Sequence, residues 1–426
     1  MSEPPHLKRT LSLFDATALA IGAIIGAGIF VISGVASGLA GPAVILSIII
    51  AGIVSSFTAY SFVRLSSKFA EEGGPYVYAK HVVSHFAGFI TGWLWLFANV
   101  VAGATVSLGL ASYVVSLFPQ IPIIPIAVSS VLILMTINIF GIRQSSIFNA
   151  VLVLLKLSAL ALFIAIGFSH LNLSFYEPFM PNGITGVLSS AALIFFAYTG
   201  FGRPATAAEE IKDPKHNIPR SIILALILSS IVYVLVGIVS VGLIPYQKLA
   251  NSGSPLTDAV DYGIKIYWLK LLVSFAAIVA TVSVLLTTVI GVSRVSFAMA
   301  RDNLLPQFLS KMHKKFSTPY ISILITGIAM AILPIFGGLR ETANVTNFGS
   351  LSAYAMVNLC AVILILRERK KQRFIIAVLP LFGLISCVSL LYFLNPISWI
   401  IGFSWIGIGV LYFIIRKSYG RSRSNF

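Results

Sequence analysis

Long apolar stretches follow one another along almost the whole chain, separated by short polar segments. A bilayer core about 30 Å thick is crossed by roughly 20 apolar residues in a helix, and the stretches are near that length. Continuous runs predict helices, because the strands of a membrane barrel alternate apolar and polar residues over short segments. We expect about twelve spans, at residues 11–37, 42–63, 86–117, 121–141, 146–168, 184–209, 219–243, 267–293, 320–337, 344–366, 374–394 and 398–415.

The composition supports this interpretation. Hydrophobic residues make up 58% of the chain and charged residues only 10%. These charged residues are too few to cover the surface of a water-soluble protein. No long polar segment separates the spans, so we expect one all-α membrane domain over residues 1–426. The partner that this predicts is the lipid bilayer.

The net charge of +16 is distributed unevenly between the two sides of the membrane. When the loops are numbered alternately, 24 of the 29 Lys and Arg fall on the side that holds both termini. The exceptions are Lys248, Lys265, Lys270 and Arg340 on the other side, and Lys156 inside a span. The positive-inside rule then predicts a multi-pass protein of the cell membrane with both termini cytoplasmic. Because the basic excess reports topology, we do not expect a nucleic-acid partner.

Two spans contain residues that interrupt helices near mid-membrane. The first reads IGAIIGAGIF and the sixth FFAYTGFGRP; the residues concerned are Gly22, Gly26, Gly28, Gly200, Gly202 and Pro204. Close helix packing explains either set of glycines alone. Their occurrence at corresponding positions, five spans apart, favours two broken helices in a five-plus-five inverted repeat, with a binding site between them. The repeats would cover 11–168 and 184–366, followed by two extra helices at 374–415 and a basic cytoplasmic tail at 416–426.

Broken helices expose backbone groups that only an enclosed polar ligand satisfies in lipid. A helix start carries a partial positive charge suited to a carboxylate, and exposed carbonyls suit an ammonium group. The amides expected here are those of Ala27, Gly28 and Ile29, and the carbonyls those of Phe196, Ala197 and Thr199. Together they predict a receptor for a zwitterion, of which an α-amino acid is the simplest. The Phe196 ring would cover this ligand, or else face lipid.

Lys156 is the one ionisable residue deep inside an expected span. A charged lysine at the helix centre costs roughly 2.5 to 3.5 kcal/mol on insertion scales, so such a residue is a functional candidate. In one hypothesis its ammonium replaces a sodium ion, binding carbonyls around Gly22 and Ala23 and the Ser283 hydroxyl, and proton loss frees those groups. Direct contact with substrate and a purely structural tether are the alternatives.

Arg203 follows the expected break in the sixth span. We expect one of three surroundings for its side chain: a cytoplasm-facing aqueous vestibule, a pair with Glu209 or Glu210, or an anionic group of the substrate. If Arg203 contacts an anionic group of the substrate, acidic amino acids become candidate substrates. The same two glutamates belong to the stretch AAEEIKDPKHNIPRSI, where Asp213–Pro214 and Asn217–Pro219 are expected to end one helix and start the next. Pairing there would contribute to an inner gate, although a solvated loop explains the stretch equally well.

Four signatures, in order, resemble the amino acid–polyamine–organocation superfamily of transporters: IGAIIGAGIF, FFAYTGFG, AAEEIKDPKHNIPRSI and SRVSFAMARDNLLP. The resemblance covers the first ten spans and implies the five-plus-five fold of LeuT-like transporters. It implies a carboxylate site at Ile25, Gly26, Ala27 and Gly28 and an amine site at Phe196, Ala197 and Thr199. Lys156 matches the fifth-span lysine of proton-coupled prokaryotic members and of the cationic amino acid transporter branch.

The resemblance also shows one departure. Gly202 stands where relatives often have an acidic residue, so a cationic substrate loses an obvious partner and neutral amino acids are favoured. We therefore expect a secondary carrier that imports neutral amino acids with protons. An amino acid exchanger and a transporter-like sensor remain alternatives. The spans contain no acid–base or metal constellation, so we expect no enzyme, cofactor or metal site.

Overall fold

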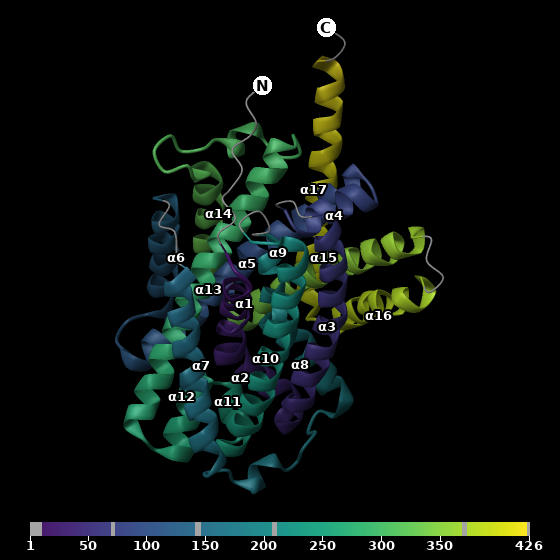
Figure 1. Ribbon diagram of the computed structural model, residues 1–426. Coiled ribbons are helices and arrows are strands. Elements are labelled where there is room, and N and C mark those ends of the chain that lie inside the picture. Colours follow the sequence, from purple (N-terminus) through teal and green to yellow (C-terminus); the bar gives the residue numbers. More distant parts are fainter. Residues whose placement is uncertain (1–10, 70–72, 141–145, 207–210, 369–372, 424–426) are drawn as a thin grey trace.

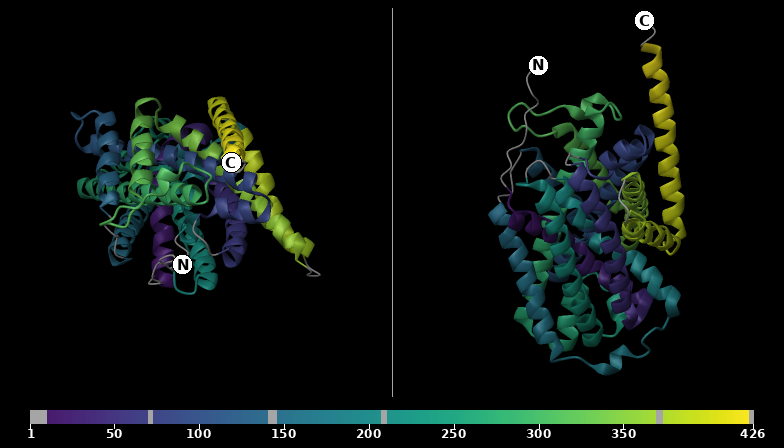
Figure 2. Two further views of the ribbon diagram at one scale, coloured as in Figure 1. Left: turned by 90° about the horizontal axis from the view of Figure 1, so that it is seen from above. Right: turned by 45° about the vertical axis from the view of Figure 1, so that its right-hand side comes forward.

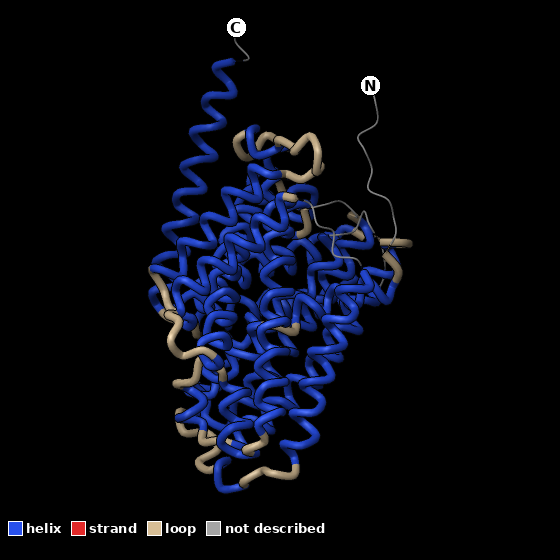
Figure 3. Tube along the Cα trace, turned by 90° about the vertical axis from the view of Figure 1, so that its left-hand side faces the viewer, coloured by secondary structure: helices blue, strands red, loops and turns tan. Residues whose placement is uncertain are grey.

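The computed structural model describes residues 11–69, 73–140, 146–206, 211–368 and 373–423. This part of the chain is built from helices and their connecting loops (Figure 3). It contains no strand beyond one isolated bridge between Leu11 and Ile211. The prediction of an all-α membrane protein is confirmed.

Every expected span is occupied by a helix. Within the described residues, nine helical stretches are long and apolar enough to cross a membrane, and the first, Leu13–Lys68, covers two expected spans. Two shorter apolar helices, Ile123–Ile139 and Tyr320–Ile335, occupy spans four and nine. The twelve spans are formed by α1 (Leu13–Ile24) with η1 (Gly28–Ile32) and α2 (Ser33–Ala40), α3 (Val44–Lys68), α5 (His85–Leu117), α6 (Ile123–Ile139), α7 (Ser146–Phe168), α8 (Gly183–Tyr198) with η4 (Thr199–Gly202) and α9 (Arg203–Thr206), α10 (Pro214–Leu243), α13 (Tyr267–Arg301), α14 (Tyr320–Ile332), α15 (Leu339–Arg367), α16 (Arg373–Tyr392) and α17 (Pro396–Arg423).

Short helices connect the spans. The two longest outer connections contain η3, α11, α12 and η6. The polar segment after the second span contains α4, which begins with Pro75 after two glycines of positive φ. The connecting helices are η2 (Gly41–Ala43), α4 (Pro75–Val82), η3 (Leu173–Tyr176), α11 (Tyr246–Ala250), α12 (Pro255–Ala259), η6 (Val260–Ile264), η7 (Gln307–Ser310) and η8 (Leu333–Ile335).

The start of α10 agrees with one half of the expectation, Asp213–Pro214, and differs from the other. The helix begins at Pro214, directly after Asp213 in the left-handed conformation with φ 42°. Proline suits the first helical position, because an N–H there has no partner within the helix. Pro219 therefore lies inside α10 rather than at its start, and the expected boundary at Asn217–Pro219 is wrong.

The two interruptions differ in kind. In the first span α1 ends at Ile24, Ile25 is extended with φ −77° and ψ 95°, and the helix resumes at Gly28. In the sixth span the chain tightens into the 3-10 turn η4 instead of breaking. The N–H of Thr199 donates to the carbonyl of Phe196, so this span remains hydrogen-bonded through its interruption. The prediction of two irregular spans is right, but only the first is fully broken.

The interrupted spans lie inside the bundle, where α1 packs against α7, α10 and α13 (Figure 1). The most apolar window of Leu13–Lys68 is 89% buried within the protein, against 17% for Pro396–Arg416. The last helix, α17, runs along the outside of the bundle (Figure 2). A site enclosed by α1 and α8 is thus shielded from lipid by the other spans.

Candidate functional site

The interrupted segments of spans one and six are in direct contact. A Cβ atom added to Gly28 would lie 2.3 Å from the Cα of Ala197, closer than real Cβ contacts come. No residue with a side chain fits at Gly28 unless the backbones move apart. The glycine therefore brings the start of η1 against the end of α8.

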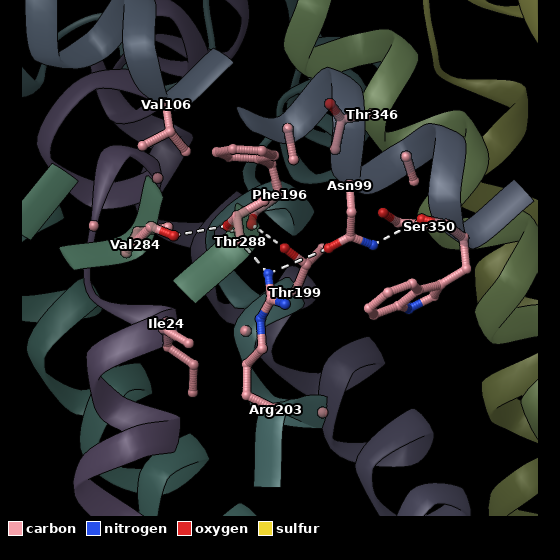
Figure 4. A pocket seen from close by; sticks show the side chains of 18 of the residues that line it. Ile24, Asn99, Val106, Phe196, Thr199, Arg203, Val284, Thr288, Thr346 and Ser350 are labelled. Carbon is pink, nitrogen blue, oxygen red and sulfur yellow. Dashed lines mark hydrogen bonds between the residues drawn. The ribbon is translucent and has the colours of Figure 1, made fainter. Parts of the chain in front are cut away.

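A cavity of about 40 Å³ opens beside this contact. Figure 4 shows the side chains that surround it. The sequence-predicted residues among its lining are Gly26, Ala27, Gly28, Phe196, Thr199, Gly202 and Arg203. Ile25 and Ala197 do not line the cavity, and Glu209 and Glu210 lie outside the described residues.

The start of η1 forms one wall of the cavity. Ala27 and Gly28 line it, and η1 continues without interruption into α2. The N–H groups of the first helical turn have no carbonyl of their own helix to donate to. These groups and the helix dipole make the wall suited to a negative charge.

The carbonyls at the end of span six already accept hydrogen bonds from side chains. The Thr199 hydroxyl donates to Phe196 O at 2.9 Å, Tyr233 donates to Ala197 O at 3.1 Å, and Tyr354 donates to Thr199 O at 2.8 Å. The Phe196 side chain is 7% exposed and stands at one side of the cavity in Figure 4. The Phe196 oxygen also accepts the Thr199 N–H, so its two lone pairs are both used, whereas the Ala197 and Thr199 oxygens each accept one of these side-chain bonds.

Lys156 lies beneath the break in the first span. Its side chain is fully buried, and Nζ donates to Gly22 O at 2.8 Å and to Ile25 O at 2.9 Å. These are carbonyls that the break deprives of their helical partners. Ser283 is 1% exposed, and its hydroxyl has no hydrogen-bond partner within the described part of the chain. The structure thus joins Lys156 to span-one carbonyls but does not hydrogen-bond it to Ser283.

Arg203 reaches into the cavity from the first residue of α9. Its Nη2 donates to Asn99 Oδ1 at 3.3 Å and to Thr288 Oγ1 at 3.1 Å. Its Cζ lies 6.0 Å from the centroid of the Trp95 ring. The guanidinium therefore lies at the cavity wall, bound to α5 and α13, rather than out in a vestibule.

Sequence reasoning missed several residues that build the site. Asn99 was detectable as an amide in the middle of an apolar span, and Tyr233 and Tyr354 as hydroxyls in apolar spans. Thr288 gives no such signal, since hydroxyl residues are frequent in these helices. The residues missed are Trp95, Asn99, Tyr233, Thr288, Thr346 and Tyr354.

The chain resembles known proteins over nearly its whole length. A family model described as amino acid permease matches residues 11–415. The methylthioribose transporter of Bacillus subtilis (strain 168) is 34% identical, with 98% of this chain and 95% of that protein covered. The branched-chain amino acid permease BcaP of the same organism is 32% identical, covering 97% and 94%. The vacuolar cationic amino acid transporter 4 of Arabidopsis thaliana is 28% identical, covering 85% and 64%.

Proposed function

Because the chain belongs to the amino acid permease family, we propose that it is a secondary carrier that takes up neutral amino acids together with protons. The chain is a multi-pass membrane transporter and not an enzyme, and its relatives support amino acid transport. The observation that carries the finer proposal is the cavity between the two interrupted spans, with a helix start on one side and Lys156 behind the break.

The backbone of the interrupted spans supports an α-amino acid as substrate. We assign its carboxylate to the N–H groups of Ala27, Gly28 and Ile29, at the start of a continuous helix. The ammonium then lies toward the carbonyls of Phe196 and Thr199, with the Phe196 ring over it. The cavity is smaller than an amino acid, so binding requires its walls to separate, as they do in alternating access.

The charge of the lining supports a neutral substrate. Among the described lining residues there is no Asp or Glu, and the one charged side chain is the cation Arg203. A Cβ atom added to Gly202 would lie 3.2 Å from the Phe62 ring. This part of the wall is therefore formed by an aromatic ring, and the glycine itself supplies no carboxylate. A lysine or arginine substrate would bring a second cation against a lining in which the described residues supply no anion.

Proton coupling rests on the position of Lys156. Its protonated amine holds the carbonyl of Gly22 in α1 and that of Ile25 within the break. A neutral amine holds them less firmly, because hydrogen bonds from charged donors are about twice as strong. Proton loss would free the segment that carries the carboxylate site. In our proposal, protonation of Lys156 thereby controls the rearrangement of the two inverted repeats, 11–168 and 184–366. We also propose that the protein lies in the cell membrane with both termini cytoplasmic.

Uptake into proteoliposomes under an imposed gradient tests the proposal. One pH unit supplies about 1.4 kcal/mol and 100 mV about 2.3 kcal/mol per charge, enough to concentrate substrate several hundredfold. The carrier should concentrate a labelled neutral amino acid, and Lys156→Ala should not. Lys311→Ala removes an exposed lysine and serves as the control.

Three results would count against the proposal. Equal accumulation by Lys156→Ala, purified as a monodisperse protein, would refute the coupling role. Uptake that requires amino acid inside the vesicles would indicate an exchanger. Binding without flux in either direction would indicate a sensor.

A further inference from the structure

Two groups of helices face each other across the cavity. In the first group α9 packs against α1 and α10, and α10 packs against α3. In the second group α13 packs against α5, α6 and α14. The first group supplies Ala23 and Ile24 to the lining, and the second supplies Asn99 and Thr288. A cavity placed between two groups in this way opens where they move apart.

The side chain of Arg203 joins the two groups. It begins α9, and in Figure 4 it comes from below with its guanidinium toward Thr288 and Asn99. Nη2 donates to Asn99 Oδ1 of α5 and to Thr288 Oγ1 of α13. The Trp95 ring of α5 lies 6.0 Å from Cζ. One residue of the first group is thus held by two helices of the second.

α13 is shaped to receive the guanidinium. A Cβ atom added to Gly291 would lie 2.0 Å from Arg203 Nη1, so only a glycine leaves room for this atom. Gly291 follows Thr288 by three residues, and both are therefore on one face of α13. We call Trp95, Asn99, Thr288 and Gly291 the Arg203 seat.

The two acceptors of the Arg203 seat are oriented by their own helices. Asn99 Nδ2 donates to Trp95 O at 2.8 Å, and the Thr288 hydroxyl donates to Val284 O at 2.8 Å. Each side chain therefore turns its donor to the backbone and its oxygen to the guanidinium. Arginine has donors and no acceptor, so this arrangement complements it.

The Arg203 seat lies at the end of the cavity toward the side of the membrane on which α1 begins. Span six passes Phe196 first and reaches Arg203 later, and the two stand on opposite sides of the cavity in Figure 4. Beyond Arg203, the N–H of Lys212 donates to Leu11 O, just before α1, at 2.8 Å. The guanidinium therefore lies between the cavity and this side.

An aromatic cluster closes the same end. Phe62, near the end of α3, packs edge-on against three other buried rings, those of Tyr78, Phe201 and Tyr354, with centroids 5.9, 5.4 and 5.4 Å away. Phe62 and Tyr354 line the cavity. Phe201 stands two residues before Arg203, so a movement that withdraws the guanidinium from its seat also withdraws Phe201 from the cluster.

We propose that Arg203 in its seat keeps the cavity closed on the side where α1 begins, and that it leaves the seat when the cavity opens there. This rests on the proposed function, because only a carrier opens its cavity to each side in turn. Hydrogen bonds made in one state alone shift the equilibrium toward that state by their own free energy. Arg203 acts here as a positioning residue, through helices α5 and α13.

Labelling of a thiol from one side of the membrane tests the proposal. Ala102 lines the cavity and is half-buried, so Ala102→Cys, in a chain that also carries Cys360→Ser and Cys387→Ser, reports access to the cavity. A membrane-impermeant maleimide is added to whole cells or to inside-out vesicles, which expose opposite faces. A peptide tag before residue 1 identifies the face on which α1 begins.

Arg203→Met keeps an unbranched side chain and removes the donors. We expect labelling from the face on which α1 begins to become about tenfold to a hundredfold faster, as for the loss of hydrogen bonds from a charged donor. Labelling from the opposite face should become slower, because the two open states compete for the same molecules.

Two substitutions on α13 change the seat and leave Arg203 in place. Thr288→Val removes an acceptor with little change of shape, and Gly291→Ala fills the space of Nη1. Both should shift labelling in the same direction as Arg203→Met, by severalfold or more.

Matched controls are available outside the cavity lining. Arg64→Met removes a guanidinium whose Nε donates to Tyr60, and Gly237→Ala places a methyl group 2.6 Å from the flexible tip of Ile48. Neither control should change the ratio of labelling rates at the two faces.

The opposed changes at the two faces decide the outcome. Faster labelling from both faces would mean that the variants loosen the whole protein, and this would overturn the proposal. Unchanged labelling in Arg203→Met, Thr288→Val and Gly291→Ala would overturn it as well. Failure of the proposed function appears in a separate measurement, since the unchanged protein would then take up no amino acid in proteoliposomes. Uptake by the unchanged protein without a one-sided shift in the variants refutes the role of Arg203 alone.

Discussion

Gly200 lies against the backbone of Ala23, where an added Cβ atom would come within 2.4 Å of the carbonyl carbon and oxygen. This contact is the counterpart of Gly28 against Ala197. In each pair a glycine of one interrupted span meets the backbone of the other, so the two spans approach each other at two points. The cavity lies beside these points because both chains are interrupted there.

Gly200→Ala should therefore destabilise the protein and reduce uptake. The atoms that the new methyl group would meet belong to the backbone of α1, which cannot rotate away as a side chain does. Overpacking of this kind costs about 1 to 3 kcal/mol. Thermal unfolding in detergent and initial uptake rates measure the two effects.

Gly407→Ala is the matched control for this substitution. Gly407 lies in α17, and nothing is within 4 Å of the position of its Cβ. Alanine favours a helix over glycine by about 1 kcal/mol, so this variant should be as stable as the unchanged protein or more so. Equal stability of Gly200→Ala and Gly407→Ala would contradict the close contact with Ala23.

Tyr233 connects the two interruptions through one hydroxyl. Its Oη is 2.7 Å from Ile24 O and 3.1 Å from Ala197 O, and its side chain is fully buried. Tyr233→Phe leaves both carbonyls without this donor, which should cost about 1 to 3 kcal/mol of folding free energy. Because the carbonyls belong to the two spans that enclose the cavity, we also expect slower uptake.

Tyr176→Phe separates these two effects. Tyr176 Oη also donates to a carbonyl, Ile238 O of α10, at 2.8 Å, but it comes from η3, outside the cavity lining. This variant should lose stability without a change in the uptake rate per folded protein. Equal uptake by the two variants would argue against a specific role of Tyr233.

The sequence allowed the interrupted spans to be located because glycine and proline leave a local signal. Gly26 lies between the end of α1 and the start of η1, and Gly28 begins η1. Lys156 was found because a charge in an apolar run is conspicuous. These features depend on single residues and their neighbours. They therefore need no knowledge of how the helices pack.

The rest of the site depends on how each helix is rotated about its axis, which local sequence does not determine. Ser283 was expected to bind the Lys156 ammonium, but its hydroxyl has no hydrogen-bond partner within the described residues. Adjacent helical residues point about 100° apart, so a small rotation of a helix changes which side chain faces a given group. Asn99 and Thr288 belong to different spans and meet only because Arg203 bridges them. Such a contact joins three helices and cannot be derived from any one of them.

An ion pair at the end of α13 predicts a pH dependence of stability. Lys80 and Tyr76 of α4 both donate to the carboxylate of Asp302. Burial acts to raise the pKa of Asp302, but the hydrogen bonds from Lys80 and Tyr76 outweigh it and hold the pKa below the usual carboxyl range. The contribution of Asp302 is therefore present above its unfolded pKa and is lost as the pH falls through its lowered folded pKa.

Asp302→Asn tests this contribution. The loss should be about 1 kcal/mol at neutral pH, since the pair is partly exposed, and the two proteins should converge in stability at acidic pH. Unfolding temperatures measured across that pH range provide the comparison. Asp261→Asn, at the exposed pair with Lys270, should change stability less. A constant difference at every pH would show that the carboxylate charge is not the cause.

The last helix is attached to the bundle through two tryptophans that bond each other's backbone. Trp93 Nε1 donates to Trp405 O at 2.9 Å, Trp405 Nε1 donates to Trp93 O at 3.2 Å, and their rings stack 4.6 Å apart. Phenylalanine at 405 retains much of the stacking and loses one donor. Trp405→Phe should therefore cost about 1 kcal/mol, and Trp405→Ala about 3 to 5 kcal/mol.

Uptake by the two Trp405 variants then shows whether α17 contributes to transport. The helix lies outside the cavity lining, so the rate per folded protein should stay unchanged in Trp405→Phe. Proteolysis of α17 should become faster in Trp405→Ala, because the stacked pair no longer holds the helix against α5. Slower uptake in Trp405→Phe at full stability would instead mean that α5, which carries Trp95 and Asn99, transmits the position of α17 to the cavity.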